Sequence, residues 1–165
     1  MSSVWKKMRG LAAATGLFVA CLGIASMPAQ AQKVLHRGNG TEPETLDPAK
    51  SSGVPESWLQ YDLFDGLLVP DGKGNFLPGA AEKWDVSPDG LVYTFHLRRN
   101  AKWSDGTPVT ARDWVFSWRR LVDPKTMADY AYFLWQVKNA QDITLGRKAP
   151  DTMGVRAVDD YTFEV

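Results

Sequence analysis

The chain of 165 residues has one cysteine, Cys21, and only two histidines. Because no cysteine follows residue 31, the rest of the chain can form neither an internal disulfide nor a thiolate metal site. His36 and His96 have no partner at the spacing of a metal site or a catalytic triad, so we expect both to be structural. A glycine-rich phosphate loop and a nucleophile elbow are also missing. These absences predict no metal, no cofactor and no catalytic residue, and therefore a protein that is not an enzyme.

Basic residues are scarce beyond the first part of the chain. The whole sequence balances 19 Lys and Arg against 19 Asp and Glu. Lys6, Lys7 and Arg9 precede residue 32, whereas every acidic residue follows it, so the remainder carries a net charge of about minus three. Nucleic-acid-binding domains usually have a basic face. We therefore expect no nucleic acid partner.

The sequence has no apolar run of the ~20 residues that a membrane-spanning helix needs. The longest run, residues 11–25, follows the basic residues and precedes the small residues Ala29 and Ala31. This order is typical of a secretory signal peptide over residues 1–31; a membrane anchor is the alternative. Residues 18–21 partly match a lipoprotein box, but the apolar residues after Cys21 favour cleavage after Ala31. We expect a periplasmic protein without a lipid anchor.

Residues 81–120 contain the most regular pattern of the chain. Apolar residues alternate with neighbours that become more polar along residues 91–98, which predicts a half-buried strand. The turn formers at 88–90 place it in a hairpin with a strand that starts near Ala81. The aromatic Trp103 among turn formers at 103–108 predicts an ordered loop.

A capped helix is predicted after this loop. Thr110 can cap it and Asp113 lies in its first turn, where the helix dipole favours an acidic residue. Apolar residues recur at helical spacing up to Leu121, and residues 122–124 end the helix at a proline. We predict that Trp84, Trp103, Trp114 and Trp118 belong to the core, because large aromatic residues dominate core burial.

Five other segments have recognisable patterns. We predict a short strand at 33–37, a helix at 55–63, a surface turn at 70–78, one or two short helices at 129–145 that stop at Gly146, and two strands at 155–158 and 161–165 with a turn between them. The fold class is therefore mixed α/β.

Five segments, in this order, resemble the N-terminal portion of the peptide-binding receptors of ABC importers. They are residues 40–48, 62–68, 78–84, 81–120 and 155–165. This family of extracytoplasmic solute-binding proteins handles oligopeptides, dipeptides, nickel complexes and haem. Residues 53–57, Gly-Val-Pro-Glu-Ser, resemble its oligopeptide branch.

The resemblance implies the N-terminal part of a class II-like periplasmic binding protein. Residues 32–63 would begin the first ligand-binding lobe, and residues 64–165 would form the small α+β subdomain that the family inserts into that lobe. Because family members are several times longer, we expect this chain to be a fragment that stops inside a strand. Residues 33–63 would then lack most of their sheet and be poorly packed.

The resemblance also implies the ligand contacts. Receptors of this branch hold an extended peptide through its main chain, while side chains sit in hydrated pockets. The positions that match their first-lobe contacts are Ser52, Gly53, Val54 and Tyr130. Close oligopeptide receptors have a glutamate where this chain has Ser52. Gly53 could instead be a turn glycine, and Tyr130 could be helix packing.

The resemblance thus implies the periplasmic component of an ABC importer that captures oligopeptides, acting as a monomer with permease subunits as partners. A truncated product without activity of its own is compatible with this. Nickel and haem ligands stay open. The alternative is a secreted domain that binds glycans or proteins through exposed tryptophans.

Overall fold

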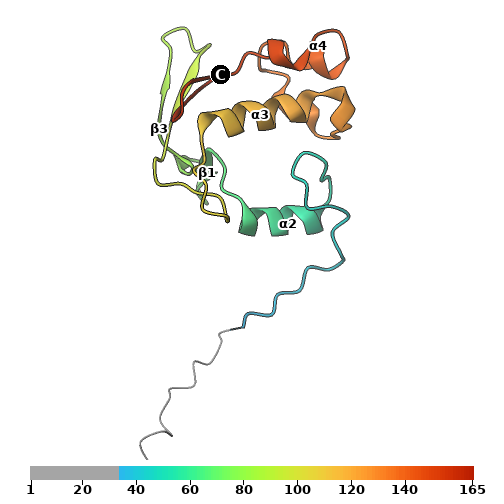
Figure 1. Cartoon of the computed structure of the whole chain (residues 1–165). Coiled ribbons are helices and arrows are strands. Elements are labelled where there is room, and N and C mark those ends of the chain that lie inside the picture. Colours follow the sequence, from blue (N-terminus) through green and yellow to red (C-terminus); the bar gives the residue numbers. More distant parts are fainter. Residues whose placement is uncertain (1–33) are drawn as a thin grey trace, which may run out of the picture. The chain divides into compact units, whose positions relative to one another are not determined.

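Residues 34–165 are described by the computed structural model (Figure 1), so the predicted signal peptide and Cys21 lie outside the described residues. Residues 34–38 belong to a different unit from Asn39–Val165. The predicted strand at 33–37 is wrong over its described part, which is irregular and exposed. A strand needs a neighbour for its ladder hydrogen bonds, and no described strand pairs with these residues.

Short helices and strands are interspersed from Asn39 onward, which confirms the mixed α/β class. In order they are α2 (Val54–Leu63), β1 (Leu68–Pro70), β2 (Phe76–Pro78), β3 (Ala81–Val86), β4 (Tyr93–Leu97), α3 (Ala111–Val122), α4 (Ala140–Thr144), β5 (Arg156–Asp159) and β6 (Thr162–Glu164), with 3-10 turns η1 (Pro124–Thr126), η2 (Ala131–Leu134) and η3 (Pro150–Thr152). None of the helices described is long and apolar enough to span a membrane.

The central sheet is antiparallel, with the strand order β3-β4-β6-β5. The predicted hairpins at 81–97 and 155–165 are both confirmed. Their register places Trp84 opposite Phe95, and Phe95 opposite Phe163 on the other side. Phe95 and Leu97 of β4 are buried, as the alternation predicts, whereas Tyr93 is 42% exposed and Leu91, which precedes the strand, is 77% exposed.

Phe163 is the centre of the core. It is fully buried, and its ring lies 6.2 Å from Phe95, 6.5 Å from Trp114 and 5.2 Å from Trp118. The tryptophans come from α3, which packs against β5 and β6 (Figure 1). The helix therefore buries its aromatic stripe on the sheet, as its periodicity predicts.

The ends of α3 follow from local chemistry. The Asp113 carboxylate accepts hydrogen bonds from the Thr110 backbone N–H at 2.7 Å and from its hydroxyl at 2.9 Å. Asp113 thus has the reciprocal role that Glu or Gln usually takes. The helix ends at Val122 because Pro124 follows, and the chain then continues as η1.

The segment predicted as one surface turn is a small hairpin. β1 and β2 pair through Val69 and Leu77, and the turn between them is closed by Asp71, whose carboxylate accepts from Lys73 N and Asn75 N at 2.8 Å each. The prolines at the strand ends concealed this pairing, since proline is tolerated at strand termini and edges.

Trp103 is the exception among the predicted core tryptophans. Trp84, Trp114 and Trp118 pack against the core, whereas Trp103 is 43% exposed. Its loop is ordered, as predicted, but through hydrogen bonds: Trp103 N donates to Thr107 O at 2.9 Å, and Asp105 accepts from Thr107. Order in this loop therefore does not require burial of the indole.

Helix α2 confirms the helix predicted at 55–63, but its apolar side chains are largely uncovered. Trp58 is 44% exposed, Tyr61 81% and Leu63 60%. Glu56 is the only buried residue of the helix. This agrees with the expectation that the residues before Phe64 are poorly packed in this chain.

Candidate ligand-binding site

The structure brings Tyr130 to the segment Ser52–Gly53–Val54, although 78 residues separate Tyr130 from Ser52. The Tyr130 hydroxyl donates a hydrogen bond to the Ser52 carbonyl at 2.8 Å. Val54 is 62% exposed and Tyr130 is 40% exposed, so both can be reached from solvent. The residues selected from sequence therefore form one accessible cluster.

The backbone of this segment presents donors rather than acceptors. The Gly53 carbonyl accepts from Ser57 N at 3.2 Å and Ser57 Oγ at 2.8 Å, and the Ser52 carbonyl accepts from Tyr130. Val54 is the first residue of α2, so its carbonyl belongs to the helical hydrogen-bond ladder. In contrast, the N–H groups of all three residues lack a hydrogen-bond partner among residues 34–165.

This arrangement limits the main-chain hydrogen bonds that Val54 can form with a ligand. Only the N–H remains free, in the first turn of a helix, where unpaired amides and the helix dipole favour an oxygen ligand. A carbonyl oxygen of an extended peptide is such a ligand. Beside it, Tyr130 supplies an apolar wall.

Tyr130 is part of an exposed aromatic cluster. Its ring lies 6.0 Å from Tyr132 and 5.4 Å from Phe133, and these two rings are 4.6 Å apart. All three side chains are at least 40% exposed. Tyr130 occupies the N-cap position of η2, and its ring lies against two rings of that turn.

An ion pair fixes the loop that leads to this segment. Arg120 of α3 donates to both carboxylate oxygens of Asp47, at 2.7 Å and 2.5 Å. These hydrogen bonds, more than the charge itself, lower the pKa of Asp47 to about 2. Asp47 also accepts from Ala49 N at 3.1 Å, so the same carboxylate orders the turn before α2.

Glu56 is buried next to Gly53, and the sequence analysis did not select it as a site residue. Its carboxylate Oε1 accepts from Glu44 N at 2.7 Å, whereas Oε2 is buried without a partner in the described chain. The available signal was a glycine followed three residues later by glutamate, which is the spacing of a helix cap and its reciprocal acidic residue.

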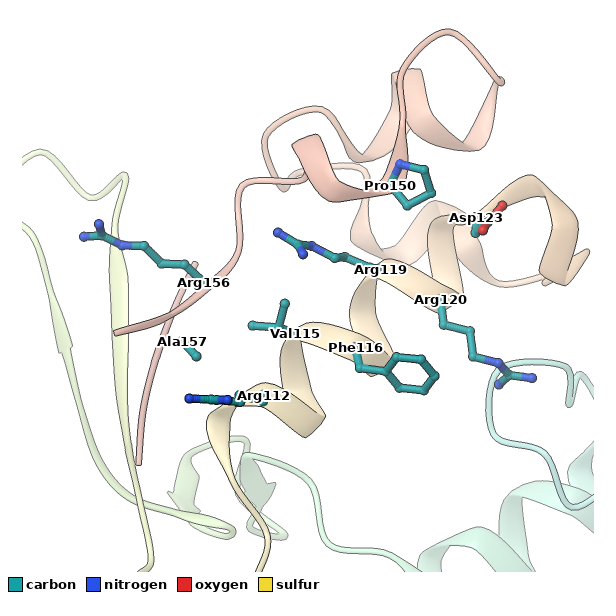
Figure 2. Close-up of a pocket in the computed structure, with 9 residues that line it drawn as sticks. All are labelled: Arg112, Val115, Phe116, Arg119, Arg120, Asp123, Pro150, Arg156 and Ala157. Atoms are coloured by element: carbon teal, nitrogen blue, oxygen red, sulfur yellow. The ribbon is translucent and has the colours of Figure 1, made fainter. Parts of the chain in front are cut away.

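The groove beside α3 does not contribute to this cluster. It has a volume of about 610 Å³, and Figure 2 shows four arginines on its rim, with Arg119 and Arg120 leaving α3 in different directions. Arg120 pairs with Asp47, Arg156 with Glu164 and Arg112 with Asp160, while Arg119 donates to the Asp151 carbonyl. Three of these cations thus face carboxylates, whereas Arg119 is bonded to a neutral carbonyl and its Nε is buried without a hydrogen-bond partner among the described residues.

Comparison with known proteins identifies the family. Residues 75–165 match the family described as "Bacterial extracellular solute-binding proteins, family 5 Middle". The chain is 57% identical over 129 residues to the periplasmic oligopeptide-binding protein OppA of Haemophilus influenzae, covering 77% of this chain and 24% of that protein. It is 50% identical to OppA of Salmonella typhimurium, covering 100% of this chain and 32% of the relative.

A solved structure agrees with these sequence relatives. The crystal structure of Haemophilus influenzae OppA in complex with RPPGFSPFR superposes with a TM-score of 0.73 at 56% identity, over 77% of this chain and 25% of that one. The chain thus spans about a quarter to a third of the length of the relatives it matches. Taken together, the fold and these matches show that the chain belongs to family 5 of the bacterial extracellular solute-binding proteins.

Proposed function

We propose that this chain is part of the substrate-binding component of an ABC importer, and that its ligand is an extended oligopeptide. The observation that carries the proposal is the identity of 50–57% to relatives named as periplasmic oligopeptide-binding proteins. The bound peptide in the OppA structure from Haemophilus influenzae supports the same ligand class.

The geometry at α2 is compatible with main-chain recognition. Free N–H groups at Ser52, Gly53 and Val54 match the carbonyl oxygens of an extended peptide. Contacts of this kind do not depend on the peptide sequence. The aromatic ring of Tyr130 would add apolar contact without a demand for one particular side chain.

At position 52 this site has a neutral hydroxyl and no carboxylate. The Ser52 hydroxyl replaces the glutamate that close oligopeptide receptors have at this position, so a ligand cation loses a possible partner here. We expect weaker preference for peptides that place a basic group next to this segment.

We further propose that residues 1–31 direct the protein to the periplasm without lipid attachment at Cys21. Residues 32–63 would begin the first ligand-binding lobe, and residues 64–165 would form an inserted subdomain. A hinge motion that closes two lobes around the peptide would present the receptor to permease subunits. The protein would act as a monomer, without nucleic acid and without catalytic activity.

The secreted glycan-binding alternative is not favoured. Its support was a set of exposed tryptophans, but Trp84, Trp114 and Trp118 pack against the core. Trp103 is exposed in its loop, and the other exposed tryptophans, Trp58 and Trp135, belong to other segments of the chain.

The experiment that tests the proposal begins with the intact mass of the protein secreted by its own organism. The same purified protein is then titrated by calorimetry with a mixture of unrelated oligopeptides, with a glycan mixture and with nickel ions as comparisons. Saturable heat with peptides alone supports the proposal. Binding of glycans or nickel without peptides would contradict it.

A further inference from the structure

Glu56 combines three properties that are rarely found together. It is 4% exposed, it carries a carboxylate, and one of its carboxylate oxygens has no hydrogen-bond partner in the described chain. An unpaired buried acceptor is costly, and a buried charge more so. Its place in the first turn of α2, where the helix dipole favours negative charge, offsets part of that cost.

The Glu56 carboxylate lies directly against the backbone at Gly53. The Gly53 φ of −101° is open to any residue, so backbone conformation does not require glycine. A Cβ on Gly53, however, would overlap Glu56 Oε2 and approach Cδ to 3.0 Å. Because Oε2 is the end of a flexible side chain, an alanine at position 53 would require the Glu56 carboxylate to move away from the backbone.

The same carboxylate reaches back to the preceding loop. Glu56 Oε1 accepts from Glu44 N, twelve residues earlier, so one side chain holds both the loop and the start of α2. The Tyr130 hydroxyl donates to the Ser52 carbonyl. The segment with free N–H groups is therefore contacted by two side chains, one buried and one exposed.

We infer that Glu56 is the positioning residue of this site: its buried carboxylate, seated against Gly53 and bonded to Glu44 N, fixes the direction of the Ser52, Gly53 and Val54 N–H groups. The expected effect of Glu56 on peptide affinity rests on the function proposed above. Its effect on the orientation of the backbone N–H groups does not, so the two effects can be tested separately.

The test uses the complete secreted protein and five variants, the fifth being Glu56→Gln. Gly53→Ala introduces the overlap, Glu56→Ala removes the group that it would strike, and the double variant combines them. Gly72→Ala is the matched control, since a Cβ there has nothing within 4 Å. Backbone amide NMR shifts of Ser52, Gly53 and Val54 are measured without ligand, followed by oligopeptide affinity and thermal stability.

We expect Gly53→Ala to move these amide resonances and to weaken peptide binding about tenfold or more, as the loss of one or two directed hydrogen bonds implies. Glu56→Ala should weaken binding similarly. In the Glu56→Ala background, Gly53→Ala should cause little further change, because coupled residues are not additive. Gly72→Ala should leave both readouts at the wild-type values.

Glu56→Gln separates shape from charge. It keeps an oxygen for Glu44 N and a group of the same size against Gly53, so affinity should stay within about threefold of wild type. Effects of Gly53→Ala and Glu56→Ala that add fully, or unchanged amide shifts in both variants, would overturn the inference. A wild-type protein that binds no peptide, with amide shifts that follow the expected coupling, would instead contradict the proposed function and leave the positioning role supported.

Discussion

Arg120 on α3 and Asp47 in the loop before α2 form a two-pronged ion pair, although 73 residues separate them in the chain. With the Tyr130 to Ser52 hydrogen bond, it gives two connections between the segment before α2 and the part of the chain between β4 and β5. Each connection can be broken by a single substitution, so its contribution can be measured.

Arg120→Met should lower the free energy of unfolding by about 1 kcal/mol, because the paired geometry is ideal but both side chains remain about one-third exposed. Urea unfolding measures the change. Arg112→Met is the control, since its ion pair with Asp160 spans 3.6 Å between exposed side chains. Equal decreases in the free energy of unfolding in the two variants would show that the Arg120–Asp47 pair stabilises the protein no more than an exposed ion pair does.

The stability that this ion pair contributes depends on pH because the pKa of Asp47 is lowered in the folded protein. The pKa of Asp47 falls from 3.8 to about 2 in the folded protein, so its contribution is complete well above pH 3.8 and is lost as pH falls toward 2. An NMR titration of the Asp47 carboxyl carbon should have its midpoint near pH 2. In Arg120→Met the midpoint should move up toward 3.8, and an unchanged midpoint would mean that Arg120 does not cause the shift.

Tyr130→Phe removes only the hydroxyl that holds the Ser52 carbonyl. We expect oligopeptide affinity to fall by about fivefold, which corresponds to about 1 kcal/mol, and the apolar wall to persist. Tyr132→Phe is the control, because the Tyr132 hydroxyl has no hydrogen bond among the residues described. The two variants are compared by calorimetry, and equal affinities would exclude a role for the Tyr130 bond.

Phe163→Ala should be the most damaging core substitution, with a loss of about 3 to 5 kcal/mol. The ring is fully buried and contacts three other aromatic rings from the sheet and α3. Phe116→Ala, on the exposed side of α3 at 68% exposure, should change stability by only about 0.5 kcal/mol. Thermal unfolding distinguishes these outcomes, and similar stabilities would contradict a core centred on Phe163.

Local patterns explain which parts of the fold could be predicted. The alternation along β4, the Thr110 and Asp113 cap and the proline after α3 each depend on residues within a few positions, so the sequence carries them directly. The strand predicted at 33–37 failed because a strand exists only with a partner, and its own residues do not reveal one. The prediction that Trp103 is buried in the core was wrong because aromatic character does not decide whether other elements cover the side chain.

For the site, the family resemblance selected Ser52, Gly53, Val54 and Tyr130, and the chemistry of each residue made it plausible. The sequence by itself determined the local elements, the lack of a metal or catalytic pattern, and the membership of these residues in a peptide-receptor pattern. It could not determine that the carbonyls of this segment are already occupied.

Only the tertiary structure decided that Tyr130 binds the Ser52 carbonyl and that Arg120 pairs with Asp47. It also decided that the Glu56 carboxylate lies directly against the backbone at Gly53. The physical reason is that hydrogen bonds and burial depend on which distant segments meet. Periodicity and capping describe a residue's neighbours along the chain, whereas the partners of a carboxylate or a carbonyl are set by the packing of the whole unit.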